Sequence, residues 1–260
     1  MAIDLIDSKI QNSFSKAALQ YDVLAKLHRE IGRELIHKIS STASCSALLD
    51  VGMGTGWFTE KLTHIFPAAL IVGLDFAPGM IDVAKKAQGD FKIVQADGQA
   101  LPFQKESFDI ITSNLAYQWM GDLRKTFESC HETLQENGIF SLTMFSYHTL
   151  NELFVALENC LKTQDAFTIH RLASKEEIEN AMASAGFRDI SVLDERIKVR
   201  FPDFLSLVKW IKDIGANAIE RDFYVGRDLL KRTGEYYEQH YKDHLGLFAT
   251  FEVVWLTAKK

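Results

Sequence analysis

The stretch Leu48–Phe58 reads LLDVGMGTGWF, and it decides how the rest of the chain is interpreted. A short apolar run comes directly before three glycines that occupy every second position. Short apolar runs bounded by glycine are typical of buried strands, and a glycine loop after a strand typically cradles a nucleotide. The stretch therefore predicts a strand that is followed by a nucleotide-binding loop.

The glycine spacing distinguishes between two kinds of nucleotide loop. Dinucleotide folds use G-x-G-x-x-G, whereas the third glycine here comes one residue earlier, at Gly56. Asp50 stands two residues before the first glycine, and a carboxylate there would repel a pyrophosphate. It suits a ligand with a positive ammonium group. The loop therefore disfavours a nicotinamide dehydrogenase.

Strand and helix patterns alternate from this loop onward, which predicts an α/β fold with a mostly parallel, doubly wound sheet. The expected sheet has seven strands, at 47–51, 69–75, 91–97, 107–114, 138–145, 187–197 and 248–258. The expected helices lie at 18–39, 59–66, 78–88, 123–134 and 175–185, the last opened by a capping box at Ser174 and Glu177. We expect a single domain over 1–260, with an N-terminal helical segment 1–44, a core 45–145, and helical insertions 146–173 and 198–245 that form a lid over the active site.

Composition and charge exclude several classes of protein. The net charge of −6 argues against a general nucleic-acid binder, which would normally show a basic surface. No apolar run approaches the ~20 residues that span a bilayer, and the first residues do not resemble a signal peptide. The three cysteines are widely spaced, which is typical of reduced thiols rather than a metal site. We expect a cytoplasmic protein without membrane or nucleic-acid partners and without a bound metal.

Two further carboxylates are expected at strand ends, where doubly wound folds bind ligands. Asp75 ends the second strand and can accept hydrogen bonds from both hydroxyls of a ribose. Asp97 ends the third strand and can accept one from the exocyclic amine of adenine. Taken alone, either acid could be a helix cap or a turn residue.

As a set, D-x-G-x-G-x-G, GLD, AD-x-x-x-LPF and FD-x-I-x-SN resemble the class I S-adenosylmethionine-dependent methyltransferases over residues 45–145. The resemblance implies S-adenosyl-L-methionine as cofactor and S-adenosyl-L-homocysteine as product. It also implies roles for nine residues. Gly52 and Gly54 would admit the cofactor's backbone, and Asp50 would orient the loop or the methionine amine. Asp75 would hold the ribose, Asp97 with Gly98 would frame the adenine, and Phe76 and Met80 would flank the adenine. Asn114 would face the reaction side.

Three other stretches carry information about the methyl acceptor. They are FSKAALQYD (14–22), SNLAYQWMGDL (113–123) and KWIKDIGANA (209–218). Together they resemble the malonyl-acyl-carrier-protein O-methyltransferase family, although that family usually has Thr after the GA of the third stretch. The resemblance implies transfer of a methyl group to the free carboxylate of malonate on the phosphopantetheine arm of a carrier protein. This reaction opens the pimeloyl branch of biotin synthesis.

Three side chains are expected on the acceptor side. Tyr21 could close over the cofactor or hydrogen-bond an acceptor oxygen, and Trp119 could form a wall of the pocket. Arg124 could pair with the malonyl carboxylate or with a phosphate of the carrier, since an arginine fork matches either anion. The plain alternatives are helix packing for Tyr21, ordinary core for Trp119 and a solvated helix face for Arg124. A carboxylate acceptor is ionised at neutral pH and needs no general base.

An acidic carrier protein would be repelled by a chain of net charge −6 unless a local basic patch receives it. The candidate cations are Lys198, Arg200, Lys209, Lys212, Arg227, Lys231 and Arg232. Two alternatives stay open from the residues: a class I methyltransferase for another small carboxylate or hydroxyl, and a non-catalytic relative that binds the cofactor. The sequence leaves the oligomeric state open.

Overall fold

The computed structural model describes residues 5–41, 45–86, 89–161, 171–216 and 225–260. One sheet runs through the molecule in the order β3-β2-β1-β4-β5-β8-β6, and the two-residue β7 pairs with β8. The strands are β1 (Ala47–Val51), β2 (Leu70–Asp75), β3 (Lys92–Gln95), β4 (Phe108–Asn114), β5 (Leu134–Phe145), β6 (Arg188–Phe201), β7 (Lys242–Asp243) and β8 (Gly246–Lys259). The first five of that order are parallel, and β8 is antiparallel to both of its long neighbours. The prediction of a mostly parallel α/β sheet is confirmed.

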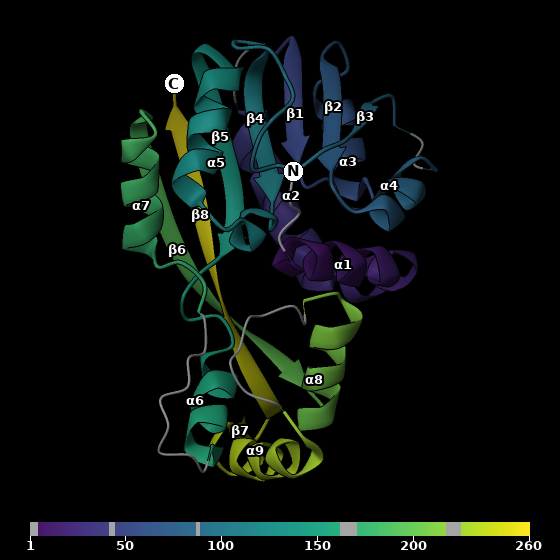
Figure 1. The fold of residues 1–260 in the computed structure, drawn as a ribbon, viewed down its shortest axis with the longest axis vertical. Helices are drawn as coiled ribbons and strands as arrows, with labels where there is room; N and C mark the ends of the chain where they lie inside the picture. Colours follow the sequence, from purple (N-terminus) through teal and green to yellow (C-terminus); the bar gives the residue numbers. More distant parts are fainter. Residues whose placement is uncertain (1–4, 42–44, 87–88, 162–170, 217–224) are drawn as a thin grey trace.

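Helices cover both faces of the sheet (Figure 1). They are α1 (Leu5–Leu24), α2 (Lys26–Ser40), α3 (Trp57–Ile65), α4 (Pro78–Ala84), the 3-10 turn η1 (Tyr117–Trp119), α5 (Leu123–Thr133), α6 (Asn151–Cys160), α7 (Lys175–Ser184), α8 (Phe204–Asp213) and α9 (Arg227–His240). Leu49 of β1 belongs to the core shared with α5 and α7, whereas its neighbour Leu48 belongs to the core shared with α2 and α3. The alternation of β1 side chains thus serves two cores, as expected for a strand buried on both faces.

Two sequence predictions differ from the structure. The single helix expected at 18–39 is two helices, because the backbone leaves the helical region at Ala25, where ψ is 34°. The break lets α1 turn away and lie across the edge where β1 and β4 end (Figure 1). The second insertion begins later than 198, because β6 continues to Phe201 and pairs there with Leu247 of β8. The capping box of Ser174 and Glu177 is confirmed.

The far ends of β6 and β8 extend beyond the rest of the sheet and carry α6, α8 and α9 (Figure 1). A separate hydrophobic core holds this part together, and it includes Phe154, Phe204, Leu207, Tyr237 and Phe251. Outside this core, α8 also contacts α1. The described parts of the two insertions therefore lie past the carboxyl edge of the sheet, the edge that also carries the cofactor loop. Residues 162–170 and 217–224 are outside the described residues.

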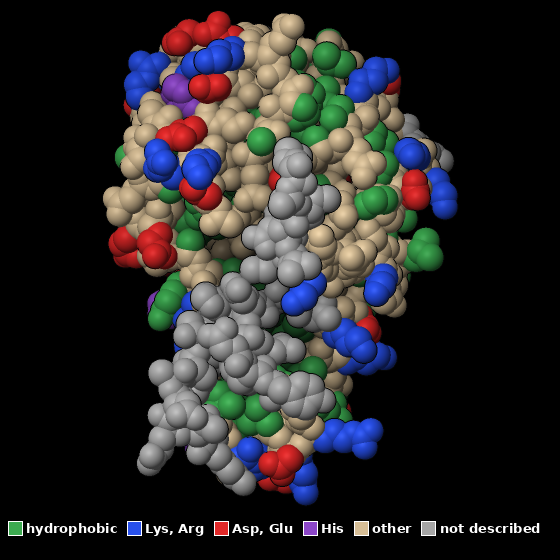
Figure 2. All heavy atoms as spheres, viewed as in Figure 1, with side chains coloured by type: hydrophobic (Ala, Val, Ile, Leu, Met, Phe, Trp, Pro, Cys, Tyr) green, Lys and Arg blue, Asp and Glu red, His purple; other side chains and the backbone are tan. Residues whose placement is uncertain are grey.

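Charged side chains are unevenly placed on the surface. Figure 2 shows Lys and Arg gathered over α8 and the adjacent part of α1. Lys16 of α1 and Lys209 and Lys212 of α8 are all exposed. Among the described helices, none combines the length and the apolar character that crossing a bilayer requires.

Candidate active site

The loop after β1 adopts a backbone that glycine permits. Gly52, Gly54 and Gly56 have φ values of 75°, 57° and 84°, all in the left-handed region. A Cβ atom on Gly52 would lie 2.3 Å from Cβ of Ala116, so no side chain fits there. A Cβ on Gly54 would meet nothing within 4 Å, which leaves its backbone accessible to a ligand. The predicted close approach of a ligand to this loop therefore has the space that it needs.

Asp75 ends β2 and fixes the loop to the following helix. Its Oδ2 accepts a hydrogen bond from Gly54 N at 2.8 Å, and its Oδ1 accepts one from Ala77 N at 2.8 Å. Burial raises the pKa of Asp75, and these backbone donors oppose the rise. Each carboxylate oxygen can accept a further hydrogen bond. The side chain is thus held rigidly with acceptor capacity left for a ligand.

Asp50 has a buried acceptor without a partner. Its Oδ2 accepts a hydrogen bond from Thr59 Oγ1 at 2.5 Å, while Oδ1 has no hydrogen-bond partner among the described residues. Burial raises the pKa of Asp50 to about 7. An unpaired buried carboxylate is costly, and a cationic ligand group would relieve that cost.

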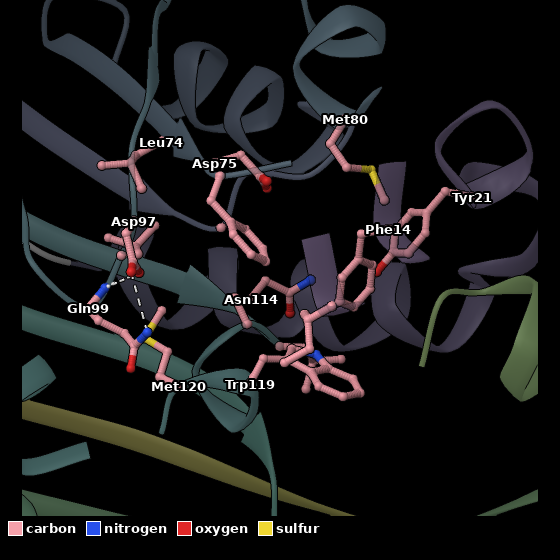
Figure 3. Close-up of a pocket in the computed structure, with 17 residues that line it drawn as sticks. Phe14, Tyr21, Leu74, Asp75, Met80, Asp97, Gln99, Asn114, Trp119 and Met120 are labelled. Atoms are coloured by element: carbon pink, nitrogen blue, oxygen red, sulfur yellow. Dashed lines mark hydrogen bonds between the residues drawn. The ribbon is translucent and has the colours of Figure 1, made fainter. Parts of the chain in front are cut away.

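A first cavity of about 750 Å³ lies at the carboxyl edge of β1, β2 and β4 (Figure 3). Nine predicted residues line it: Tyr21, Gly52, Asp75, Phe76, Met80, Asp97, Gly98, Asn114 and Trp119. At Gly98, a Cβ atom would lie only 2.8 Å from Cε of Met120, so a larger residue would clash with the wall of the cavity. The structure therefore brings together residues that the sequence separates by almost a hundred positions.

Asp97 sits at the outer end of this cavity and is exposed. Its carboxylate accepts hydrogen bonds from Gln99 N at 2.9 Å and from Gln99 Nε2 at 3.4 Å (Figure 3). The turn places the carboxylate beside Gly98 and Met120, which also line the cavity. The cavity therefore has one exposed carboxylate at its rim, that of Asp97, and one buried carboxylate deeper inside, that of Asp75.

Two further cavities adjoin the first. The second, of about 680 Å³, is enclosed by α1, α2, the segment after β4, β5, α6, α8 and β8. Its lining residues are Phe14, Tyr21, His28, Leu115, Gln118, Trp119, Phe145, Thr149, Leu150, Phe154, Leu172, Trp210, Ile211, Ile214, Ala216 and Phe251. The third, of about 430 Å³, reaches Asp22, Arg29 and Asp50. Tyr21 lines all three cavities, so its side chain marks the place where they meet.

The junction also carries backbone strain. Leu115 and Leu150 both have φ of 57°, a region that a bulky side chain rarely occupies. Both line the second cavity, and Leu115 lines the first as well. Left-handed non-glycine residues cost of order 1–3 kcal/mol and concentrate at functional sites.

Asn114 is held by three elements that meet at the junction. Its Nδ2 donates to His28 O at 3.0 Å, and its Oδ1 accepts from Thr143 Oγ1 at 2.9 Å. These bonds connect the end of β4 to α2 and β5. Asn114 therefore faces the first and third cavities in a fixed orientation.

Gly54 and Arg124 are the two predicted site residues that line none of the three cavities, and Arg124 lies at the surface. Its guanidinium lies on the exposed side of α5 and donates to Glu128 Oε1 at 2.7 Å. The arginine is the second residue of an amphipathic helix whose buried side is formed by Thr126, Phe127 and Cys130. The structure thus places Arg124 away from the cavities, and its pairing with an acceptor carboxylate and its contact with a carrier phosphate both stay predictions.

Several lining residues were not predicted from the sequence, chiefly His28, Phe145 and Trp210 in the second cavity. A usable signal existed in part. Phe14, Tyr21 and His28 follow one another at intervals of seven, the spacing of side chains on one face of a helix, although the helix breaks at Ala25 between Tyr21 and His28. The indole of Trp210 donates to Leu24 O at 3.2 Å, a contact between residues 186 positions apart that no local pattern indicates.

The described residues contain no group of three or more His, Cys, Asp or Glu side chains arranged to hold a metal ion.

A methyltransferase-domain family model matches residues 49–142. The chain is similar to a malonyl-[acyl-carrier protein] O-methyltransferase of Hahella chejuensis, at 33% identity over 95% of this chain and 88% of the relative. The corresponding protein of Methylococcus capsulatus is 32% identical over 95% of this chain and 92% of its own length. The fold is similar to the crystal structure of Bacillus subtilis YcgJ, with a TM-score of 0.63, 19% identity, and coverage of 90% of this chain and 98% of that one.

Proposed function

Because the chain belongs to the family of malonyl-[acyl-carrier protein] O-methyltransferases, we propose that it methylates the free carboxylate of a malonyl group carried on an acyl carrier protein. It is an S-adenosylmethionine-dependent methyltransferase with the Rossmann-like fold of that class. The observation that carries the proposal is the apolar second cavity, which adjoins the cofactor cavity and shares Tyr21 and Trp119 with it as lining residues.

The residues around the first and third cavities fit the cofactor. Adenosine would occupy the first, with its ribose hydroxyls on Asp75 and its base beside Phe76 and Asp97. The methionine end would occupy the third, where its ammonium meets the unpartnered Oδ1 of Asp50 and its carboxylate faces Arg29. When bound, the cofactor supplies a methyl group on a positively charged sulfur, and that sulfur keeps the electron pair of the broken C–S bond.

The second cavity suits a carboxylate that acts as a nucleophile. Its described lining residues include no Lys or Arg, so no fixed cation there would hold the negative charge too tightly to react. The oxygen that attacks the methyl carbon loses its charge as the sulfonium loses its own. Apolar walls favour such mutual neutralisation, because water no longer stabilises the separated charges. The carboxylate is already ionised at neutral pH, so the reaction needs no general base.

Tyr21 and Trp119 would align the acceptor with the methyl group. The Trp119 ring packs edge-on against Phe14, with centroids 5.4 Å apart, and Phe14 contacts Tyr21 at 6.5 Å. The three rings point toward one another in Figure 3. Aromatic packing of this kind restricts side-chain motion, and alignment is the main task in an in-line displacement.

The carrier protein would dock beside α8. The inner side of this helix supplies Trp210 and Ile211 to the second cavity, while Lys209 and Lys212 are exposed on its outer side. Three other predicted cations are already paired: Arg200 with Asp243, Lys231 with Glu235, and Arg232 with Asp228. We therefore narrow the predicted basic patch to α8, where an acidic carrier could place its arm directly into the cavity.

The product would be a neutral methyl ester. Since the ester hides the charge of the malonyl group, enzymes that elongate fatty-acid chains could accept it for pimeloyl and biotin synthesis. In this proposal the whole chain acts as one domain, with residues 45–145 binding the cofactor and the insertion helices forming the acceptor side.

A single assay tests the proposal. Purified protein is mixed with S-adenosylmethionine and malonyl carrier protein, and mass spectrometry follows the carrier-bound acyl group. We expect a gain of one methyl on malonyl carrier protein and none on acetyl carrier protein, which lacks the free carboxylate. Cofactor binding without any methyl ester would refute the acceptor and favour a different carboxylate, a hydroxyl acceptor or a non-catalytic relative.

A further inference from the structure

His28 is a polar residue at the centre of the acceptor side, and the proposed methyl transfer assigns it no role. It lies in the first turn of α2 and lines both the second and the third cavity. Its Nδ1 is buried, and neither ring nitrogen has a hydrogen-bond partner among the described residues. An unpaired buried donor or acceptor costs about 1–3 kcal/mol, so its retention at this place calls for a ligand.

Aromatic rings hold the imidazole in one orientation. Its centroid lies 5.8 Å from Tyr21, 5.7 Å from Phe145 and 6.4 Å from Trp210. The backbone carbonyl of His28 accepts the hydrogen bond from Asn114 that ties α2 to β4. The ring is therefore positioned beside Tyr21, where the acceptor cavity meets the cofactor cavities.

The surroundings keep this ring neutral. Burial lowers the pKa of His28 to about 4. Its place in the first turn of a helix adds to this effect, because the positive end of the helix dipole disfavours a second positive charge. A neutral imidazole carries one N–H donor and one acceptor nitrogen.

A second orphaned atom in the same cavity points to a ligand of mixed polarity. Gln118 Nε2 donates to Leu115 O at 2.7 Å, which fixes the amide, and its buried Oε1 has no partner among the described residues. The cavity thus offers a free N–H donor and a free carbonyl acceptor within apolar walls. A carboxylate joined to an amide-bearing arm presents the matching acceptor and donor.

We propose that His28 is a positioning residue for the methyl acceptor, an inference that rests on the proposed function. Its ring N–H donates a hydrogen bond to the malonyl carboxylate oxygen that is not methylated. The other oxygen keeps its lone pairs for attack on the methyl carbon. A neutral donor orients the carboxylate without the tight charge pairing that would weaken the nucleophile. This role replaces the one predicted for Arg124.

The hydrogen bond should be stronger in the ground state than in the transition state, because the carboxylate loses its charge during transfer. Removing the donor should therefore raise KM and leave kcat unchanged or slightly higher. His28→Phe keeps an aromatic ring among Tyr21, Phe145 and Trp210 but lacks both nitrogens. We expect its KM for malonyl carrier protein to rise roughly ten- to hundredfold, as for a hydrogen bond to a charged group.

Stability separates this role from a structural one. His28→Phe removes an unsatisfied buried nitrogen, so its Tm without ligand should equal or exceed that of the unaltered protein. His28→Gln, which keeps an N–H donor, should restore KM to within about fivefold. His131→Phe makes the same chemical change on α5, where His131 packs against Phe187, and should leave KM unchanged.

The outcomes distinguish the two proposals. If the unaltered protein binds the cofactor but forms no malonyl methyl ester, the proposed function fails. If it forms the ester and His28→Phe retains its KM, or loses kcat and Tm together, only the role of His28 is overturned.

Discussion

The cofactor side and the acceptor side of this molecule are built in opposite ways. On the cofactor side, the carboxylates of Asp50, Asp75 and Asp97 lie at or near the carboxyl ends of neighbouring strands, and each accepts at least one hydrogen bond from the protein. On the acceptor side, the walls come from seven separate elements and are almost entirely apolar. In the proposed function, the charged cofactor would be recognised by short local motifs, whereas the acceptor would be recognised by the shape of the cavity and by a few neutral hydrogen-bond donors.

This difference predicts where substitutions act. Changes to the buried carboxylates of Asp50 and Asp75 should weaken cofactor binding strongly, because buried charged hydrogen bonds are lost. Changes on the acceptor side should alter KM or kcat while the cofactor still binds. The following tests address that contrast, from the largest expected effect to the smallest.

Asp75→Ala should have the largest effect. It removes the acceptor proposed for the ribose and leaves the N–H groups of Gly54 and Ala77 without a partner. We expect the Kd for S-adenosylmethionine, measured by calorimetry, to rise roughly a hundredfold or more. Asp97→Ala is the matched control, since this carboxylate is exposed, and it should cost less than Asp75→Ala. Equal losses for both variants would contradict the contrast between buried and rim carboxylates.

Cofactor affinity should depend on pH through Asp50. The pKa of this carboxyl is about 7 in the unliganded protein, and only its ionised form can pair with the cofactor's ammonium. Affinity should fall roughly 15-fold between about pH 7 and about pH 5.5. Asp50→Asn should bind more weakly and lose most of that dependence, and an unchanged pH profile in this variant would refute the pairing.

The same pKa predicts the opposite trend for stability without cofactor. The folded-state pKa of Asp50 is raised from 3.8 to about 7, so its contribution to stability is fully present below about pH 3.8 and is lost progressively as the pH rises from there to about 7. The Tm of the cofactor-free protein should decline over this range more than that of Asp50→Asn. Added cofactor should remove the difference.

Tyr21→Phe tests the residue at which the three cavities meet. It removes only the hydroxyl, and the ring contacts with Phe14 and His28 remain. We expect kcat/KM for malonyl carrier protein to fall roughly tenfold, the equivalent of one hydrogen bond, with cofactor Kd within about twofold. A loss confined to cofactor binding would assign Tyr21 to the cofactor side.

Charge reversal on α8 should have a smaller effect. The double variant Lys209→Glu and Lys212→Glu should raise KM for malonyl carrier protein about fivefold at low salt, with the difference shrinking as salt is added. A small malonyl thioester without the carrier protein should react unchanged. The matched control is Lys231→Glu with Arg232→Glu on α9, where both cations are already paired. Equal losses for the two double variants would remove α8 as the docking surface.

Arg124→Ala should have the smallest effect. Exposed ion pairs such as that of Arg124 with Glu128 contribute about 0–1 kcal/mol. We expect kcat/KM for a small malonyl thioester to stay within about twofold. A tenfold rise in KM would return the guanidinium to the acceptor site.

The cofactor half of the site was predictable because its information is local. In LLDVGMGTGWF, the order of apolar residues, acid and glycines determines a strand, a turn with positive φ and a buried carboxylate within eleven positions. Asp75 and Asp97 could be added because carboxyl ends of parallel strands meet at one edge of a sheet. Of the nine residues predicted to bind the cofactor, all except Gly54 line a cavity, and Gly54 donates to Asp75.

The acceptor half was predictable only where a motif lies in one segment. Tyr21 and Trp119 were found because FSKAALQYD and SNLAYQW are continuous stretches. Arg124 follows that motif closely, but the turn of α5 directs its side chain to the surface, so the structure does not bring it to the cavities. Its distance along the chain gave no information about the face of the helix that points to the cavity.

By itself, the sequence determined the α/β sheet and the loop with its three glycines, because strand period and turn conformation are properties of short segments. The cofactor followed from the resemblance of the same segments to class I methyltransferases. Only the tertiary structure decided what surrounds the acceptor. The break at Ala25 lets α1 cross the end of the sheet, and the long β6 and β8 carry α8 to meet it. His28 and Trp210 become neighbours through that packing, since burial of apolar surface acts between segments that are 182 residues apart in the chain.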